Sequence, residues 1–149
     1  MDSTDRKILK VLQADARASL QQIGQAVGLS ASPCWERIRK LEAAGVIEGY
    51  TVRLNAQALG FQDTVLVQVT LDSHSDNTLE KFGETLAAIP EVIEAYLVSG
   101  EYDYLLRVAV KDTRDYERLL RERLYKIKGI RHSKSSFVLR TLKKADLPL

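Results

Sequence analysis

The sequence has little of what builds several classes of protein. Cys34 is its only cysteine among 149 residues, so the chain forms no internal disulfide and suits a reducing compartment. One cysteine and two separated histidines, His74 and His132, do not form a Cys/His metal site. No apolar run approaches the roughly 20 residues that cross a bilayer, and the N-terminal ten residues lack the features of a secretion signal. We therefore expect a cytoplasmic protein with no membrane segment, metal or resident cofactor.

Neither sign of charge is in large excess, because the chain has 22 Lys and Arg residues and 20 Asp and Glu residues, which gives a net charge of +2. Residues 1–60 hold eight basic and six acidic residues, whereas residues 61–149 hold fourteen of each. A surplus in the first part fits a part that contacts phosphates, but two charges do not identify a partner. The placement of individual side chains is therefore needed to identify the partner.

The first part of the chain shows helical spacing of apolar residues, interrupted by residues that cap or end helices. Gly28 provides the left-handed conformation that a sharp helix exit prefers. The expected elements are a helix over 3–16 capped by Ser3 or Thr4, a helix from Ser19 to Gly28, a helix from Ser30 to Gly45, and a small hairpin or wing over Val46–Leu54.

Two helices joined by a short turn that contains glycine predict a helix-turn-helix, whose second helix enters the major groove of DNA. In that second helix Cys34, Ile38 and Leu41 share one face and turn inward. The opposite face reads bases, and cations beside it reach phosphates. The predicted DNA-binding residues are Ser32, Trp35, Glu36, Arg37, Arg39 and Lys40.

These residues also have ordinary interpretations. The basic cluster also fits the solvated face of an amphipathic helix, although its place in the motif favours DNA. Glu36 repels phosphate, so it either accepts from a cytosine amino group or, as we favour, pairs with Lys40 one turn later. Trp35 either stacks at the boundary with DNA or fills a gap beside the linker. Cys34 lies in the inward stripe, which favours a buried structural thiol over a redox switch.

Beyond the connector at residues 55–62 the apolar period changes from helical spacing to two. Strands are expected over 65–71, 92–98, 104–110 and 130–142, with helices from Asp76 or Asn77 to Pro90 and from Asp112 or Thr113 to Gly129. The order βαββαβ predicts a ferredoxin-like antiparallel sheet with both helices on one face, which leaves the other face for a second copy of the chain. The expected fold is α+β, with a winged helix-turn-helix over 1–54, a linker over 55–62 and the ferredoxin-like domain over 63–149.

Several motifs in this order and spacing make the chain resemble the leucine-responsive and asparagine-type (Lrp/AsnC, feast/famine) transcription regulators of bacteria and archaea. The resemblance covers essentially all 149 residues. The matching pieces are Asp5–Leu9, Val27–Ser30, Ser32–Cys34, Arg37–Glu42, Gly45–Ile47, Gly49–Tyr50 and Val98–Leu106.

The resemblance implies a DNA-binding domain joined to an amino-acid-sensing domain that forms dimers and then tetramers or octamers, with the effector between dimers. A loop with backbone N–H groups and an acidic side chain suits the carboxylate and ammonium of a free amino acid. An ordinary hairpin explains Gly100 equally well and Asp103 in part. The implied effector residues are Ser99, Gly100, Glu101, Tyr102 and Asp103, completed from the last strand by Ser135, Ser136 and Phe137.

The leading hypothesis is a sequence-specific regulator of amino-acid metabolism genes, located on the nucleoid, whose DNA binding or assembly responds to an amino acid, with leucine first on resemblance alone. The alternative is a nucleoid-organising protein that has no effector. An enzyme is disfavoured because the sequence offers no nucleophile–base pair and no phosphate-binding glycine loop. The expected partners are double-stranded DNA, a free amino acid and further copies of the chain.

Overall fold

The computed structural model describes residues 1–73 and 75–149. His74, which we interpret from the sequence as a surface residue rather than a metal ligand, lies outside the described residues. The chain divides into two compact units. The first comprises Met1–Leu54 together with Lys143–Leu149, and the second comprises Asn55–Leu142. Within the described residues, no helix is both long and apolar enough to cross a membrane.

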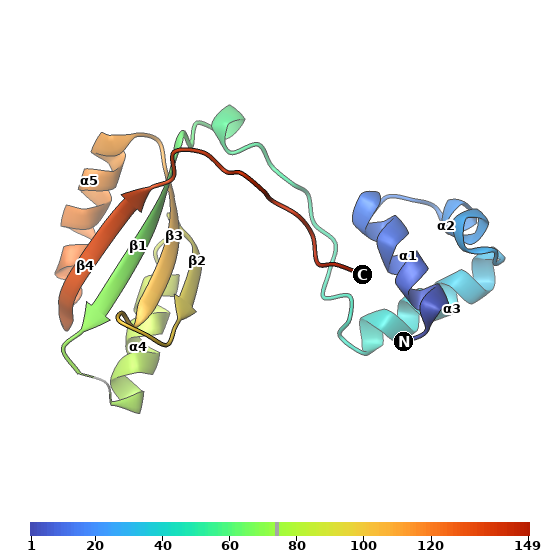
Figure 1. The fold of residues 1–149 in the computed structure, drawn as a ribbon, viewed down its shortest axis with the longest axis horizontal. Coiled ribbons are helices and arrows are strands. Elements are labelled where there is room, and N and C mark those ends of the chain that lie inside the picture. Colours follow the sequence, from blue (N-terminus) through green and yellow to red (C-terminus); the bar gives the residue numbers. More distant parts are fainter. Residues whose placement is uncertain (74) are drawn as a thin grey trace. The chain divides into compact units, whose positions relative to one another are not determined.

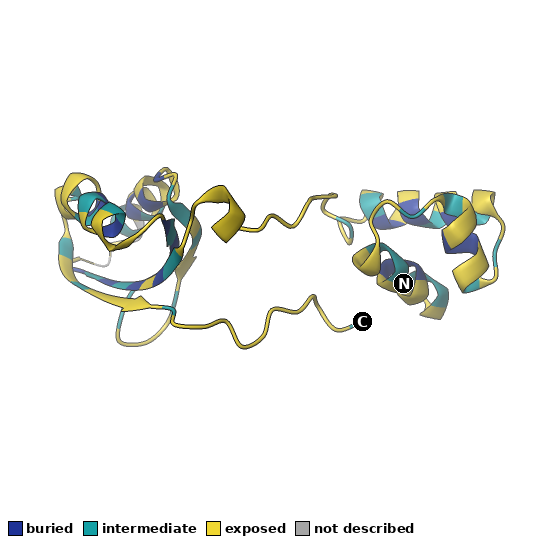
Figure 2. Ribbon diagram, turned by 90° about the horizontal axis from the view of Figure 1, so that it is seen from above, coloured by how far each residue is buried: buried dark blue, intermediate teal, exposed yellow. Residues whose placement is uncertain are grey.

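The first unit is a bundle of three helices, α1 (Ser3–Ala14), α2 (Leu20–Val27) and α3 (Ala31–Ala43) (Figure 1). Each helix buries one side and exposes the other, as the dark blue and yellow ribbons of Figure 2 show. The centre of the core contains Ile8, Ile23, Cys34 and Ile38. Cys34 is 0% exposed, which confirms the buried thiol.

The turn between α2 and α3 depends on two glycines. Gly28 adopts φ 76° and ends α2 as predicted. Gly24, one turn earlier, accepts the N–H of Leu29 at 2.9 Å. A Cβ on Gly24 would lie 2.4 Å from the carbonyl oxygen of Leu29, so only glycine lets the turn approach the helix this closely. The pattern of apolar residues gave no sign of this second requirement.

The caps of two helices differ from the prediction by one or two residues. The N-cap of α1 is Asp2 rather than Ser3 or Thr4. The Asp2 carboxylate accepts the N–H of Asp5 at 2.8 Å, and the Asp5 carboxylate accepts the N–H of Asp2 at 2.9 Å. This reciprocal capping box satisfies two N–H groups that the helix leaves unpaired. Helix α4 (Asp76–Ala87) is capped by Ser75, one residue before the predicted positions.

The hairpin or wing predicted over Val46–Leu54 is wrong, because these residues form no strand in the structure. Val46, Tyr50, Val52 and Leu54 are all exposed. An isolated two-stranded hairpin is only marginally stable in water unless a third strand or an apolar surface supports it. Apolar side chains that stay in solvent provide no such support, so the segment runs as an irregular chain.

The second unit contains a four-stranded antiparallel sheet in the order β2-β3-β1-β4. Helices α4 and α5 cover one face of it (Figure 1). This is the predicted βαββαβ arrangement, which confirms the α+β fold. The remaining elements are η1 (Gln57–Leu59), β1 (Asp63–Leu71), β2 (Val92–Leu97), β3 (Tyr104–Val110), α5 (Thr113–Glu122), η2 (Leu124–Lys126) and β4 (Ile130–Phe137).

Alternation along the central strands builds the core of this unit. Val65, Val67 and Val69 of β1 point toward the helices and pack with Phe82 and Tyr116, among others. The last strand, predicted to reach Leu142, ends at Phe137. Phe137 pairs with Val65 near the start of β1, and one further bond runs from the N–H of Val138 to the oxygen of Thr64. Beyond that point only Asp63 of β1 remains, so there is almost no strand left for a longer β4 to pair with.

On the face of the sheet away from the helices, several side chains remain wholly or partly in contact with solvent. Leu66 of β1 and Tyr96 of β2 are exposed there, and Leu105 of β3 is half-buried. Arg107 donates to Glu94 across the β2–β3 pair on the same face. Apolar side chains mixed with a paired charge resemble the surfaces on which subunits associate more than a solvated sheet face.

Replacing Gly24 with alanine should lower the free energy of unfolding of the first unit by about 1–3 kcal/mol, because the added methyl group overpacks the turn. Urea unfolding followed by fluorescence of Trp35, the only tryptophan, measures this unit directly. Gly49→Ala is the matched control: nothing lies within 4 Å of its Cβ, so its effect should stay within about 0.5 kcal/mol. Equal effects of the two substitutions would contradict the close approach at Gly24.

Candidate DNA-binding and effector sites

The outer face of α3 presents a group of exposed side chains on the side opposite its buried stripe of Cys34, Ile38 and Leu41. The structure therefore brings five of the six predicted DNA-binding residues together on one surface, and each is exposed. They are Ser32, Trp35, Glu36, Arg39 and Lys40. This surface has a hydroxyl, an aromatic ring, an acid and two cations, which are groups that contact base edges and phosphates.

Arg37, the sixth residue, is held by the N-terminus of α1. Its Nη1 atom lies 2.7 Å from an oxygen of Asp2 and 2.7 Å from an oxygen of Asp5. The side chain of Arg37 is 34% exposed. The capping-box hydrogen bonds, followed by those from Arg37, lower the pKa of Asp2 and of Asp5. The same two carboxylates, Asp5 first, raise the pKa of Arg37. We call this group, Arg37 with Asp2 and Asp5, the α1–α3 clamp.

The clamp changes the distribution of charge over α3. Two carboxylates surround Arg37, so its charge is compensated within the unit. Within the part of the chain that the structure describes, no ion pair involves Arg39 or Lys40. The ion pair that we favoured between Glu36 and Lys40 is therefore not formed. Arg39 and Lys40 remain as the free cations of the outer face.

Trp35 lies on the same face, one turn before Arg39. Its side chain is 51% exposed, a large fraction for a tryptophan. The Cζ atom of Arg39 lies over the ring at 5.4 Å from its centroid. This distance is within the range in which a guanidinium is attracted to the face of an indole.

The loop between β2 and β3 is a closed hairpin with an anchored acid. The N–H of Val98 donates to the oxygen of Asp103 at 2.9 Å, and Gly100 adopts φ 135°. Ser99, Gly100 and Glu101 are exposed, and Tyr102 and Asp103 are half-buried. The Oδ2 atom of Asp103 accepts the N–H of Leu71 at 2.7 Å. Asp103 therefore ties the loop to the end of β1, in addition to any contact with a ligand.

The predicted residues of the last strand lie elsewhere in the same copy of the chain. Tyr104, which follows the loop, pairs with Val69 of β1, whereas Phe137 pairs with Val65. Four residues along a strand span about 13 Å, and β1 separates β3 from β4. One copy of the chain therefore does not bring the loop and Phe137 into one site.

Two of these residues pack on α5 instead. The hydroxyl groups of Ser135 and Tyr116 form a hydrogen bond, and the ring of Phe137 meets that of Tyr116 edge to face at 5.4 Å between centroids. Burial raises the pKa of Tyr116. Ser136 pairs with Leu66, so it faces away from the helices.

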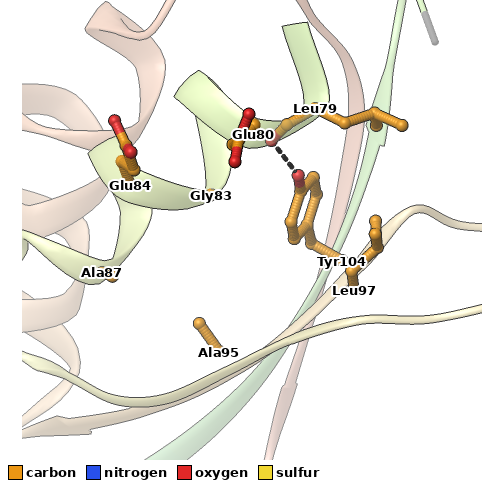
Figure 3. Close-up of a pocket in the computed structure, with 8 residues that line it drawn as sticks. All are labelled: Leu79, Glu80, Gly83, Glu84, Ala87, Ala95, Leu97 and Tyr104. Atoms are coloured by element: carbon orange, nitrogen blue, oxygen red, sulfur yellow. Dashed lines mark hydrogen bonds between the residues drawn. The ribbon is translucent and has the colours of Figure 1, made fainter. Parts of the chain in front are cut away.

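A cavity of about 530 Å³ adjoins the loop, a feature that the sequence analysis missed (Figure 3). Leu97 and Tyr104, the residues that flank the loop, form one part of its wall together with Ala95. Helix α4 provides the rest, which is Leu79, Glu80, Gly83, Glu84 and Ala87. The hydroxyl of Tyr104 donates to the carbonyl oxygen of Leu79 and so joins the two sides, and burial raises its pKa. Residues from separate elements form this cavity, so local motifs did not indicate it.

The residues that the structure describes include no group of three or more His, Cys, Asp or Glu side chains placed to hold a metal ion.

Comparison with known proteins gives matches over both units. Residues 1–42 match the AsnC-type helix-turn-helix domain, and residues 64–148 match the Lrp/AsnC ligand binding domain. The chain is 38% identical over 146 residues to the leucine-responsive regulatory protein of Klebsiella pneumoniae, which covers 98% of this chain and 89% of the relative.

Two solved structures are also similar. An AsnC family transcriptional regulator from Agrobacterium tumefaciens superimposes with a TM-score of 0.94 and 40% identity, over 99% of this chain and 97% of the other. A transcriptional regulator from Neisseria meningitidis in complex with L-Met superimposes with a TM-score of 0.93 and 32% identity, over 99% and 96% of the two chains.

Neutralising Asp5 as Asp5→Asn should destabilise the first unit at neutral pH and flatten its acid dependence. A carboxylate whose pKa is lowered by folding stabilises the folded state above its ordinary pKa, and that stability is lost as the pH falls through the lowered value. The parent chain should therefore lose stability below about pH 4, and Asp5→Asn should lose less over the same range. The measurement is the urea midpoint by Trp35 fluorescence between neutral pH and strong acid.

Glu48→Gln is the control for this experiment, because Glu48 is exposed in the same unit and the described residues show no ion pair to it. Identical acid profiles for Asp5→Asn and Glu48→Gln would rule out a contribution from the α1–α3 clamp.

Proposed function

Because the chain belongs to the Lrp/AsnC family of transcription regulators, we propose that it binds double-stranded DNA sequence-specifically through α3 and that a free amino acid changes its DNA binding or its assembly. It is a transcription regulator with a helix-turn-helix domain and a ligand-binding domain. We place it in the cytoplasm on the nucleoid and assign it no catalytic role. The observation that supports the DNA-binding proposal most is the outer face of α3, where Arg39 and Lys40 keep their charges free.

Arg37 has a different task in this proposal. Its guanidinium is bound by two carboxylates at 2.7 Å, and moving it to a phosphate would leave both acids without their partner. We propose that Arg37 holds α3 against α1, so that it supports DNA binding without contacting the duplex. Arg39 and Lys40 provide the contacts.

For the effector, we propose a site that combines the β2–β3 loop of one copy of the chain with residues of another copy. This arrangement is supported by the separation of about 13 Å along the sheet between the loop and the end of β4 in one copy. The exposed backbone of Ser99–Glu101 suits a carboxylate, and Asp103 suits an ammonium group. The neighbouring cavity, whose wall includes Leu79, Ala87 and Leu97, offers room for an aliphatic side chain.

Leucine is our first candidate and methionine the second, since both present an aliphatic side chain and each is named in connection with a relative. The open face of the sheet is the surface on which we expect two copies to dimerise, followed by assembly to tetramers or octamers. A response requires that the amino acid bind one assembly or one DNA-binding state more tightly than the other.

The DNA-binding part is tested by anisotropy of a labelled duplex from upstream of the protein's own gene, titrated at several salt concentrations. Arg39→Gln and Lys40→Gln should each weaken binding and lower the slope of log affinity against log salt by about 1 where a phosphate contact is lost. Arg37→Gln should weaken binding with no change in slope. Asp5→Asn should also weaken it, because it loosens the same clamp.

The sign of the Asp5→Asn effect decides the task of Arg37. If Arg37 contacted a phosphate, Asp5→Asn would remove a carboxylate that binds the Arg37 guanidinium. The guanidinium would then be freer to reach the phosphate, and DNA binding would tighten. If the parent chain shows no salt-sensitive binding, that result would contradict the DNA-binding proposal itself.

The effector part is tested with Asp103→Asn, which keeps an oxygen to accept the N–H of Leu71 but removes the charge. L-Leucine and L-methionine should shift DNA affinity or sedimentation of the parent chain, and Asp103→Asn should abolish that shift while DNA affinity without effector is retained. Asp72→Asn, a neighbouring exposed carboxylate, is the control and should respond normally. A parent chain that binds DNA but ignores all amino acids would instead indicate an effector-independent nucleoid protein.

A further inference from the structure

The pair of Trp35 and Arg39 is a feature of α3 that the proposed function does not yet explain. Trp35 is the only tryptophan of the chain, and about half of its surface remains in solvent. It lies four residues before Arg39, so the two side chains share one face of the helix. The guanidinium carbon lies 5.4 Å from the centre of the indole ring.

The position of Arg39 over the ring suits recognition, because a guanidinium interacts with different partners through different parts of the group. Its planar face interacts with an aromatic ring, whereas its N–H groups lie in the plane and point outward. A guanidinium that rests on an indole by its planar face therefore keeps its N–H edge available for another partner. Among the described residues, no carboxylate forms an ion pair with Arg39.

Arg37 provides a comparison on the same helix. Its Nη1 atom donates to both Asp2 and Asp5, so this end of its guanidinium is bound within the protein. Arg39 instead lies over the ring of Trp35. Of the two, only Arg39 has no ion pair among the described residues, and bidentate contact with the O6 and N7 atoms of guanine uses two guanidinium donors.

A long arginine side chain loses rotamer freedom when it is fixed against a base, and this loss weakens binding. A side chain that already rests on a rigid ring loses less of that freedom. We propose that Trp35 is a positioning residue that holds Arg39 ready to read a guanine edge, and that Trp35 thereby contributes to sequence discrimination at the base that Arg39 reads. This inference rests on the proposed DNA-binding function of α3.

The test compares discrimination base by base. A panel of duplexes, each with one base pair of the bound site changed, is titrated with the parent chain, Arg39→Ala, Trp35→Ala, Trp35→Phe and the double variant. Arg39→Ala should reduce discrimination at one position by about five- to 150-fold. Trp35→Ala should reduce discrimination at that same position by roughly two- to fivefold and leave the other positions unchanged.

Two variants make this result specific. Trp35→Phe keeps an aromatic face and should retain much of the discrimination. The double variant should match Arg39→Ala, because without the guanidinium the ring has nothing to position. Circular dichroism and thermal unfolding of Trp35→Ala check that the helix-turn-helix remains folded.

Three outcomes would overturn the inference. An effect of Trp35→Ala at a different base would make Trp35 a direct DNA contact, an equal effect at all bases would make it structural, and no effect would make the stacking irrelevant. If the parent chain binds no duplex with base discrimination, the proposed function fails as well, so the two failures are distinguishable.

A second measurement needs no DNA. Arg39→Gln should increase the quenching of Trp35 fluorescence by acrylamide, because the guanidinium no longer covers one face of the ring. Lys40→Gln, which removes a neighbouring charge, is the control and should leave quenching unchanged. Equal quenching in the parent chain and Arg39→Gln would show that the pair does not form in solution.

Discussion

The structure of the first unit depends on the packing of α3 through only one of its sides. Cys34, Ile38 and Leu41 anchor that side, and the small core around Ile8 and Ile23 receives it. A core of this size provides limited stability, yet the opposite side of α3 has to stay uncovered. The close backbone approach at Gly24 and the ion pairs of Arg37 add restraint without occupying the outer face.

Much of the fold follows from local patterns, because apolar spacing and glycine punctuation report on neighbouring residues. Gly28 ended α2 as expected, and the change of period after residue 62 marked the start of the sheet. The remaining errors have physical causes. Asp2 was missed as the cap of α1 because serine and threonine next to it are equally good caps on propensity alone. The wing failed because its apolar residues stay in solvent, which a sequence does not record.

The candidate sites could likewise be predicted only where neighbouring residues in the sequence determine the geometry. The outer face of α3 could be predicted because helical periodicity assigns each residue to a side. Arg37 could not, since its partners Asp2 and Asp5 lie more than thirty residues away in the chain. The loop and Ser135–Phe137 share no neighbourhood in one copy because the strand register, set by pairing with β1, separates them. The cavity between α4 and the sheet also arises only from packing.

The position of β1 between β3 and β4 has a consequence for how the chain folds. Val65, near the start of β1, pairs with Phe137 of β4, so the central strand lacks one neighbour until β4 has been synthesised. The contacts among α1, α2 and α3 are short in sequence and form early. On the ribosome the helical unit can therefore fold first, while the sheet waits with an open edge that is prone to wrong pairing.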